Sequence, residues 1–318
     1  MKVIGGYFEL ELAKGEEYHK DAIRLNTGRN AFEYILKAKA YKKVYLPFYT
    51  CDVMLEPIKK LNIKYEFYSI RNNFEPIFDF HKVKLDDVFV YTNYFGICNR
   101  IVKEVSEQCK NLIIDNSQAF FSRPLPDVDT FYSARKFFGI PDGAYLYANK
   151  QINENLETDI SYQRCEHLLG RIDIGAEEFY DEFKRNDDLL KNQPIKQMSN
   201  LTRTLLSTVD YQNISARRQN NFHFLHSHLM SINEMNLNAD LDSAAMIYPL
   251  LIKNGNKIKD YLISNKIFIA TYWPGIGELV DTNSTEMHFV TNLVCIPIDQ
   301  RYDEKDMERI KNLILNYA

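Results

Sequence analysis

Short apolar segments alternate with amphipathic ones between Leu25 and Asn149, and this alternation is the feature that most constrains the fold. Apolar runs suited to buried strands occupy residues 44–47, 65–70, 88–92 and 112–114. Segments with apolar residues at helical spacing occupy residues 30–40, 52–58 and 101–109, with Asp52 as a candidate cap. Strands joined by helices are typical of parallel sheets, because a parallel connection has to cross one face of the sheet. The sequence therefore predicts an α/β fold built on a large, mostly parallel sheet.

The chain changes character after Asn149. Residues 166–192 are rich in charge and predict helices in part, and residues 198–232 predict one long helix or a broken pair. The rest predicts a small α+β unit, with strands at 246–252, 267–270 and 293–296 and helices at 258–264 and 304–315. We therefore expect a large α/β domain over residues 1–199 and a small C-terminal α+β domain over residues 200–318, which the long helix opens.

The overall charge gives no reason to expect a polyanionic partner. Lys plus Arg number 39 and Asp plus Glu number 43, so the net charge is −4. Such a balance argues against nucleic acid as the main partner, and any anionic ligand must be held by a local pocket. The longest notable apolar run, residues 244–252, is too short for a bilayer span of about 20 residues, so no membrane insertion is expected.

Cysteine and histidine spacing argues against a metal site. The five cysteines are scattered without a C-x-x-C pair, which indicates neither a disulfide framework nor a zinc site. The histidines of NFHFLHSH, at 223, 226 and 228, have no cysteine or carboxylate beside them, so a helix face is expected there and no metal. Charges interrupt the N-terminal segment before a secretion signal can form, and a cytoplasmic location is expected.

The residues that follow the predicted strands are the candidates for function. In open α/β sheets, ligands bind in the crevice beyond the carboxyl ends of the strands. Three segments follow such strands, at 47–51, 93–96 and 115–118. Asp115 ends an apolar strand, and a carboxylate there could hold a heterocyclic nitrogen in its protonated form, as expected for pyridoxal phosphate (PLP).

Lys136 lies among aromatic residues, in the run FYSARKFF. If those neighbours removed the amine from water, its pKa would fall and the free amine could form a Schiff base. The alternative is that Lys136 is an ordinary loop lysine and that Asp115 only caps the next turn. Spacing alone leaves both interpretations open.

The segment Thr27-Gly28-Arg29-Asn30 precedes the first predicted helix. Glycine permits a close approach of the backbone, and the free N–H groups at a helix start attract anions. Arg29 could add a positive charge. A phosphate site is one interpretation, and a simple helix cap formed by the polar residues is the other.

Taken in order, several segments resemble the fold-type I PLP enzymes and, within them, the DegT/DnrJ/EryC1/StrS sugar aminotransferases. The similar segments are NTGRNAFEYIL, VYLPFYTCDVMLEPI, TNYFG, IIDNSQAF, DTFYSARKFFGIPDGAYLYAN and LVCIPIDQRYDEKDMERIKNLI. The resemblance covers residues 25–150 well and the C-terminal third loosely. Its most specific parts are the D-x-x-Q pattern and the lysine segment, in that order.

The resemblance implies a role for each matching residue. Lys136 would form the Schiff base with PLP and move the substrate proton, Asp115 would pair with the pyridinium nitrogen, and Gln118 would contact the 3′-oxygen side of the ring. Gly28, Arg29 and Ser133 would bind the phosphate. The whole implied cofactor-binding set is Gly28, Arg29, Asn30, Tyr49, Cys51, Asp115, Gln118, Ser133 and Lys136.

The sequence departs from the family at several of these positions. Cys51 lies where members often have an aromatic residue stacked on the cofactor ring, and Tyr49 is a possible substitute. Ser133 stands where members usually have a histidine, three residues before the lysine. The family's N-x-R loop, which crosses the dimer interface, is represented at most by Arg185-Asn186.

The resemblance implies an aminotransferase that takes an amino group from a donor such as glutamate and passes it to a nucleotide-linked keto-sugar, for a surface polysaccharide. It also implies a homodimer, the commonest oligomer. Two alternatives remain open at this point. One is other PLP chemistry on a smaller substrate, and the other is a member that binds a ligand or partner without turnover.

Overall fold

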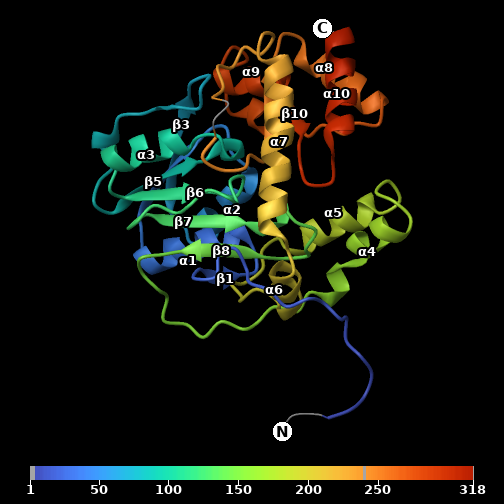
Figure 1. Cartoon of the computed structure of the whole chain (residues 1–318). Coiled ribbons are helices and arrows are strands. Elements are labelled where there is room, and N and C mark those ends of the chain that lie inside the picture. Colours follow the sequence, from blue (N-terminus) through green and yellow to red (C-terminus); the bar gives the residue numbers. More distant parts are fainter. Residues whose placement is uncertain (1–3, 239–240, 318) are drawn as a thin grey trace.

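The computed structural model describes residues 4–238 and 241–317. Eight strands of the described chain form one sheet in the order β1-β8-β7-β6-β5-β2-β3-β4 (Figure 1). The strands are β1 Ile23–Leu25, β2 Lys43–Pro47, β3 Lys64–Ile70, β4 Pro76–Ile77, β5 Asp87–Thr92, β6 Leu112–Asp115, β7 Asp129–Ser133 and β8 Ala144–Tyr147. The central run from β3 to β7 is parallel, and the outer pairs are antiparallel. The predicted α/β fold with a mostly parallel sheet is confirmed.

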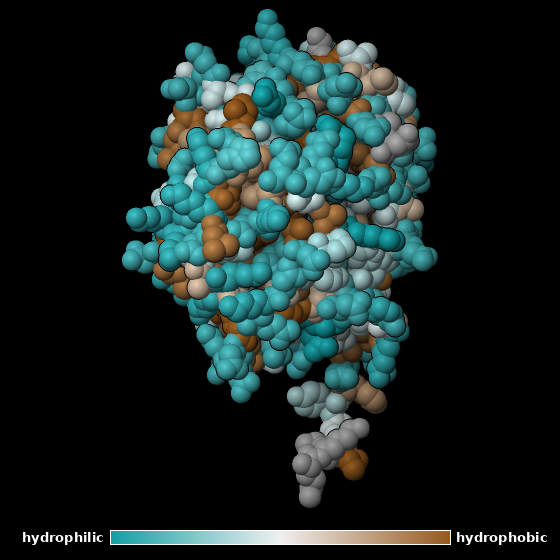
Figure 2. Space-filling model, turned by 90° about the vertical axis from the view of Figure 1, so that its left-hand side faces the viewer, coloured by the Kyte–Doolittle hydropathy of each residue, from teal (hydrophilic) through white to brown (hydrophobic). Residues whose placement is uncertain are grey.

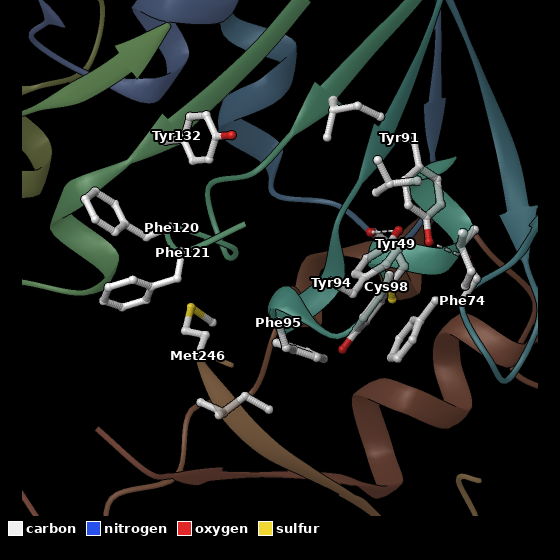
Figure 3. Close-up of a cluster of buried hydrophobic side chains, with 14 of the residues drawn as sticks. Tyr49, Phe74, Tyr91, Tyr94, Phe95, Cys98, Phe120, Phe121, Tyr132 and Met246 are labelled. Atoms are coloured by element: carbon white, nitrogen blue, oxygen red, sulfur yellow. Dashed lines mark hydrogen bonds between the residues drawn. The ribbon is translucent and has the colours of Figure 1, made fainter. Parts of the chain in front are cut away.

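Both faces of the sheet are covered, as a parallel sheet requires. Helices α1 (Gly28–Lys39) and α2 (Leu55–Lys60) cover one face, and α3 (Asn99–Gln108) packs on the other. Strand β5 has apolar residues on both faces of the sheet. Val88 and Val90 belong to the cluster with α1, whereas Phe89 and Tyr91 belong to the cluster with α3. Figure 3 shows the second cluster, whose rings gather where the sheet meets the C-terminal part of the chain.

The C-terminal part forms a second unit with its own core. Strands β9 (Ile247–Leu251) and β10 (Leu293–Pro297) pair antiparallel. Four helices pack with them, namely α7 Tyr211–Leu229, α8 Gly255–Ser264, α9 Thr285–Asn292 and α10 Glu304–Tyr317. The segment predicted as a long helix or a broken pair is a pair, with α6 (Asn200–Ser207) ahead of α7. The domain boundary at residue 200 stays a prediction.

Two local predictions are wrong. Residues 267–270 form only one isolated bridge, between Ala270 and Cys295, because Ile267 and Ile269 are buried as loop residues, and their alternation mimics a strand. Asp52 does not cap a helix: it lies inside the short helical turn Asp52–Met54, and its carboxylate accepts a contact from the Cys51 thiol instead of a backbone N–H.

The charged segment after residue 160 contains two helices, α4 (Glu166–Asp173) and α5 (Tyr180–Leu189), as predicted in part. They project from the body beside α6 and α7 (Figure 1). On the face of the molecule seen in Figure 2, hydrophilic side chains predominate and hydrophobic ones are scattered in small groups. In the described part of the chain, no helix is long and apolar enough to cross a membrane.

Candidate functional site

The three segments predicted at the carboxyl ends of the strands do meet. Strands β6, β5 and β2 are neighbours, and they end at Asp115, Thr92 and Pro47 respectively. The hydroxyl of Tyr94 donates to the carbonyl oxygen of Tyr49 at 2.8 Å, which joins two of the following segments. The third segment is joined through Gln118, described below. The parallel order of the strands therefore assembles the site from residues far apart in the sequence.

Asp115 is a buried carboxylate at the end of β6. The backbone N–H of Ser117 donates to its Oδ1 at 2.8 Å, so the following turn holds the carboxylate in place. Burial raises the pKa of Asp115, while hydrogen bonds from Ser117 and the nearby charge of Lys136 lower it. The carboxylate and the lysine are thus close enough to affect each other electrostatically.

Lys136 ends a short helical turn, Ala134–Lys136, that follows β7. Its side chain is exposed, whereas those of Phe137 and Phe138 are buried. The aromatic neighbours therefore do not remove this lysine from water, because the rings of Phe137 and Phe138 pack into the core. The pKa of the Cys51 thiol is raised by burial and lowered by the charge of Lys136, so Cys51 lies near the lysine too.

Gly28 opens α1 and faces two serines. A β-carbon added to Gly28 would lie 3.4 Å from Oγ of Ser117 and 3.7 Å from Cβ of Ser133. Thr27 caps the helix by accepting from the N–H of Asn30 at 3.1 Å. The first N–H groups of a helix lack acceptors within it, and Thr27 takes up only that of Asn30 with its side chain. We call Gly28, Ser117 and Ser133 the glycine–serine cradle, whose chemistry suits a small anion.

Arg29 and Asn30 have other partners. Nη1 of Arg29 lies 2.7 Å from Oε2 of Glu56 in a largely buried ion pair. The side-chain amide of Asn30 donates to the carbonyl oxygen of Gln193 at 2.9 Å, and its oxygen accepts from Thr27. The role of both residues toward a cofactor stays a prediction.

Tyr49 is buried in the core, with its ring 4.8 Å from that of Trp273 and 5.3 Å from that of Phe289. Two of its contacts therefore come from the C-terminal unit. Cys51, two residues later, is only partly buried and lies next to Lys136. Whether either residue contacts a cofactor ring stays a prediction.

Gln118, three residues after Asp115, is buried and is held by the backbone of another loop. The N–H of Phe95 donates to its Oε1 at 3.2 Å. Phe95 has φ of 54°, the left-handed region that a non-glycine residue rarely adopts, and Gly96 follows at 76°. In the described residues, nothing accepts from the amide nitrogen of Gln118, which leaves a donor in the site.

Sequence reasoning missed Ser117, Arg135 and the contacts of α5. Nη1 of Arg135 donates to Oδ1 of Asp187 at 3.0 Å, and the amide of Asn186 donates to the carbonyl oxygen of Pro141 at 3.1 Å. Helix α5 is therefore fastened to the loop that carries Lys136. From the sequence, Arg185-Asn186 is at most a weak counterpart of an interface loop, and the contacts of this segment with the lysine loop depend on proximity in space.

Comparisons with known proteins place the fold. No family model matches the sequence, and no curated protein matches it. Among solved structures, DesV from S. venezuelae, in complex with a ketimine intermediate, is 12% identical with a TM-score of 0.66 over 93% of this chain and 84% of that one. NtdA from Bacillus subtilis with bound cofactor PMP is 10% identical with a TM-score of 0.66, over 93% and 72% of the two chains.

A third solved structure is described as a member of the family by name. The DegT DnrJ EryC1 StrS aminotransferase from Brucella abortus is 13% identical with a TM-score of 0.62, over 93% of this chain and 85% of that one. At such identities the similarity establishes the architecture. This chain has the fold of the DegT DnrJ EryC1 StrS aminotransferases, the expectation that its motifs raised.

Proposed function

We propose that this chain is a PLP-dependent aminotransferase. The observation that carries the proposal is the arrangement at one edge of the sheet, where Lys136 lies near the buried Asp115 and the glycine–serine cradle lies beside them. An amine, a buried carboxylate and an anion site are the three features that PLP requires of a protein. The ketimine and PMP complexes of DesV and NtdA support this choice of cofactor.

The residues present fit PLP. A β-carbon at Gly28 would enter the space beside Ser117 and Ser133, so the glycine keeps the cradle open for a phosphate. The bond from Phe95 holds the oxygen of the Gln118 amide, so its nitrogen is the end able to donate to the 3′-oxygen of the ring. Asp115 is held by the N–H of Ser117, and its carboxylate would accept from a ring nitrogen.

PLP, when bound, supplies an electron sink for the carbanion that forms when the substrate loses a proton. Lys136 would hold the cofactor covalently and then carry the proton to and from the substrate carbon. Asp115 would keep the ring nitrogen protonated, because a nearby carboxylate favours the charged form. The cradle would hold the phosphate and so fix the ring against Lys136.

The substrates that we propose are an amino donor such as glutamate and a nucleotide-linked keto-sugar, in a cytoplasmic pathway to a surface polysaccharide. Support for the sugar comes from the sequence motifs and from the fold. A screen of nucleotide keto-sugars with glutamate, read out as 2-oxoglutarate formed, tests this finer assignment. Turnover of simple keto acids alone would favour the smaller-substrate alternative.

A second candidate function is ligand binding without turnover. The observation that favours it is that the Tyr49 ring packs in the aromatic core, while Cys51 is the residue of that segment on which the charge of Lys136 acts. A cofactor ring without an aromatic cover would be held less firmly. PLP binding with no exchange of amino groups would favour this candidate.

We also propose a homodimer, in which the second copy covers the apolar face of α4 and α5. Large hydrophobic side chains are exposed there, including Leu169 at 60%, Ile172 at 82% and Phe183 at 46%. Monomeric proteins rarely expose such groups together. Because α5 is fastened to the lysine loop through Asp187 and Asn186, this face adjoins the site.

The experiment that tests the function is an absorption spectrum of the purified protein with added PLP, before and after borohydride, followed by peptide mapping. A visible band that is converted into a stable adduct on Lys136 is the expected result, and Lys136→Arg, which keeps the charge, should give neither band nor adduct. A colourless protein, or labelling only at lysines other than Lys136, such as Lys150, would contradict the proposal.

A further inference from the structure

The second unit of the chain contacts the lysine turn through Phe137, the residue after Lys136. Phe137 is 3% exposed, and its N–H closes the turn by donating to the carbonyl oxygen of Ala134 at 3.0 Å. The guanidinium carbon of Arg218 lies 4.6 Å from the centre of the Phe137 ring. Nε2 of Gln300 donates to the carbonyl oxygen of Phe137 at 2.9 Å. One residue of the turn is thus held both at its ring and at its backbone.

Arg218 lies on α7 and also binds the segment that leads into β9. Its Nη1 donates to the carbonyl oxygens of Met246 at 3.0 Å and Ala245 at 3.3 Å. The N–H of Met246 in turn donates to the carbonyl oxygen of Phe95 at 2.8 Å. Figure 3 shows Met246 between Phe95 on one side and Phe121 on the other. A single guanidinium therefore connects the lysine turn to the loop that orients Gln118.

Stability alone does not account for this arginine. Arg218 is 2% exposed, and burial lowers its pKa to about 10, although the charge of Asp299 raises it. Its Nε is buried without a hydrogen-bond partner, and across residues 4–238 and 241–317 it forms no ion pair with a carboxylate. An apolar side chain of similar size would avoid this desolvation cost. What an apolar residue would not supply is the combination of stacking on Phe137 and two bonds to the β9 segment.

We propose that Arg218 is a positioning residue for Lys136. Arg218 stacks on Phe137 and so connects the lysine turn to the segment before β9. The inference rests on the proposed function, because the position of Lys136 matters where the lysine forms a Schiff base. Gln300 completes the arrangement by holding the carbonyl group of the same residue. Removal of the guanidinium frees the turn without altering Lys136 itself.

The first test is hydrogen exchange of the cofactor-free protein, followed by mass spectrometry. The N–H groups of Phe137 and Phe138 both donate to Ala134, so they report on the turn. In Arg218→Met they should exchange at least about fivefold faster, the lower bound expected for loss of one cation–π contact. Arg217→Met removes an exposed charge from the same helix and should change nothing.

A control separates positioning from stability. Lys259 is buried on α8, and its Nζ donates to the carbonyl oxygen of Val290 on α9 at 2.9 Å. Lys259→Met should lower the unfolding temperature while the exchange of the turn stays as in the wild type. Gln300→Leu, which removes the bond to the Phe137 carbonyl, should speed exchange even if Arg218→Met does not fold. Unchanged exchange of the Phe137 and Phe138 N–H groups in every folded variant of Arg218 and Gln300 would overturn the inference.

The second test is the rate at which a borohydride-trapped adduct forms on Lys136 after mixing with PLP. Arg218→Met should slow it about fivefold and Arg218→Lys, which keeps the cation, should restore part of the rate. If the wild type forms no adduct on Lys136, the proposed function fails, and the exchange measurement still decides whether Arg218 holds the turn. If the wild type forms it and Arg218→Met matches the wild type in both tests, only this inference fails.

Discussion

The backbone N–H of Phe95 donates to Oε1 of Gln118 at 3.2 Å, and this bond fixes which end of the Gln118 amide is free. The carbonyl oxygen is used, and the amide nitrogen has no acceptor among the described residues, so it is the end able to donate to a ligand. The left-handed backbone of Phe95 and the bond from Met246 to its carbonyl oxygen hold the loop in this conformation. A strained loop thus serves to orient one side chain.

Gln118→Met should weaken PLP binding about tenfold, because it removes a donor to the 3′-oxygen and leaves the N–H of Phe95 without its buried acceptor. A titration of the visible absorbance with PLP measures the affinity. Gln108→Met, on the exposed surface of α3, is the matched control and should bind as the wild type does. Equal affinities for all three proteins would remove Gln118 from the site.

Gly28→Ala should separate cofactor binding from stability. The added methyl group would meet Ser117 at 3.4 Å, an ordinary contact that the fold accommodates, but it would occupy the cradle. We expect the unfolding temperature to hold, since alanine favours a helix by up to about 1 kcal/mol over glycine, and PLP affinity to fall about tenfold. Gly275→Ala, which has open space around it, is the control. Undiminished affinity would mean that the phosphate binds elsewhere.

Asp115→Asn should keep the fold and lose the reaction. The asparagine oxygen can still accept from the N–H of Ser117, so we expect no loss of stability. Without the negative charge the ring nitrogen would lose its proton, and kcat should fall about 10²- to 10³-fold. Single-turnover kinetics with glutamate measures this step. A rate within a few-fold of the wild type would show that Asp115 is not the partner of the ring.

Much of this site followed from local sequence patterns. Apolar runs predicted β2, β5 and β6, and the edge of a parallel sheet predicted that the residues after them would meet. Asp115 is buried as expected, because the last residue of a buried strand is enclosed by the same neighbouring strands and helices. These inferences succeed because each depends on a few neighbouring residues and on one general rule of topology.

The rest depends on contacts between distant segments. The aromatic neighbours of Lys136 left open whether its amine is buried or exposed, and the folded chain exposes it, because side-chain exposure is set by the turn and not by the composition around it. The partnership of Ser117 with Gly28 and of Arg218 with Phe137 joins residues far apart in the chain. No periodicity encodes such pairs, so only the folded structure reveals them.

His19 should make stability depend on pH. Its Nε2 donates to the carbonyl oxygen of Phe120 at 2.8 Å, and in the neutral ring its Nδ1 accepts from the hydroxyl of Tyr147 at 3.2 Å. Burial lowers the pKa of His19 to about 4, whereas that of an unfolded histidine is about 6.5. Below pH 6.5 the unfolded chain binds a proton that the folded chain does not, and stability falls until about pH 4.

The difference between the pKa of His19 in the folded chain and in the unfolded chain corresponds to about 3 kcal/mol of unfolding free energy. This contribution is present above pH 6.5 and lost by about pH 4. His19→Gln keeps a donor for Phe120 and has no titratable ring, so its stability should fall less over that range. Urea unfolding at pH 7, 5.5 and 4 measures the slope. His223→Gln, on the exposed face of α7, is the control, and parallel curves for wild type and His19→Gln would contradict the account.

Ile172→Lys should dissociate the proposed dimer. Ile172 is 82% exposed at the end of α4, and a lysine there would place a charge in an apolar interface. We expect the dissociation constant to rise about 30-fold or more, the effect typical of a residue central to an interface. Sedimentation equilibrium at several protein concentrations measures it. Leu85→Lys, at an 89% exposed position before β5, is the matched control and should leave the dimer intact. A wild-type protein that sediments as a monomer, or equal dissociation of both variants, would rule out α4 and α5 as the dimer surface.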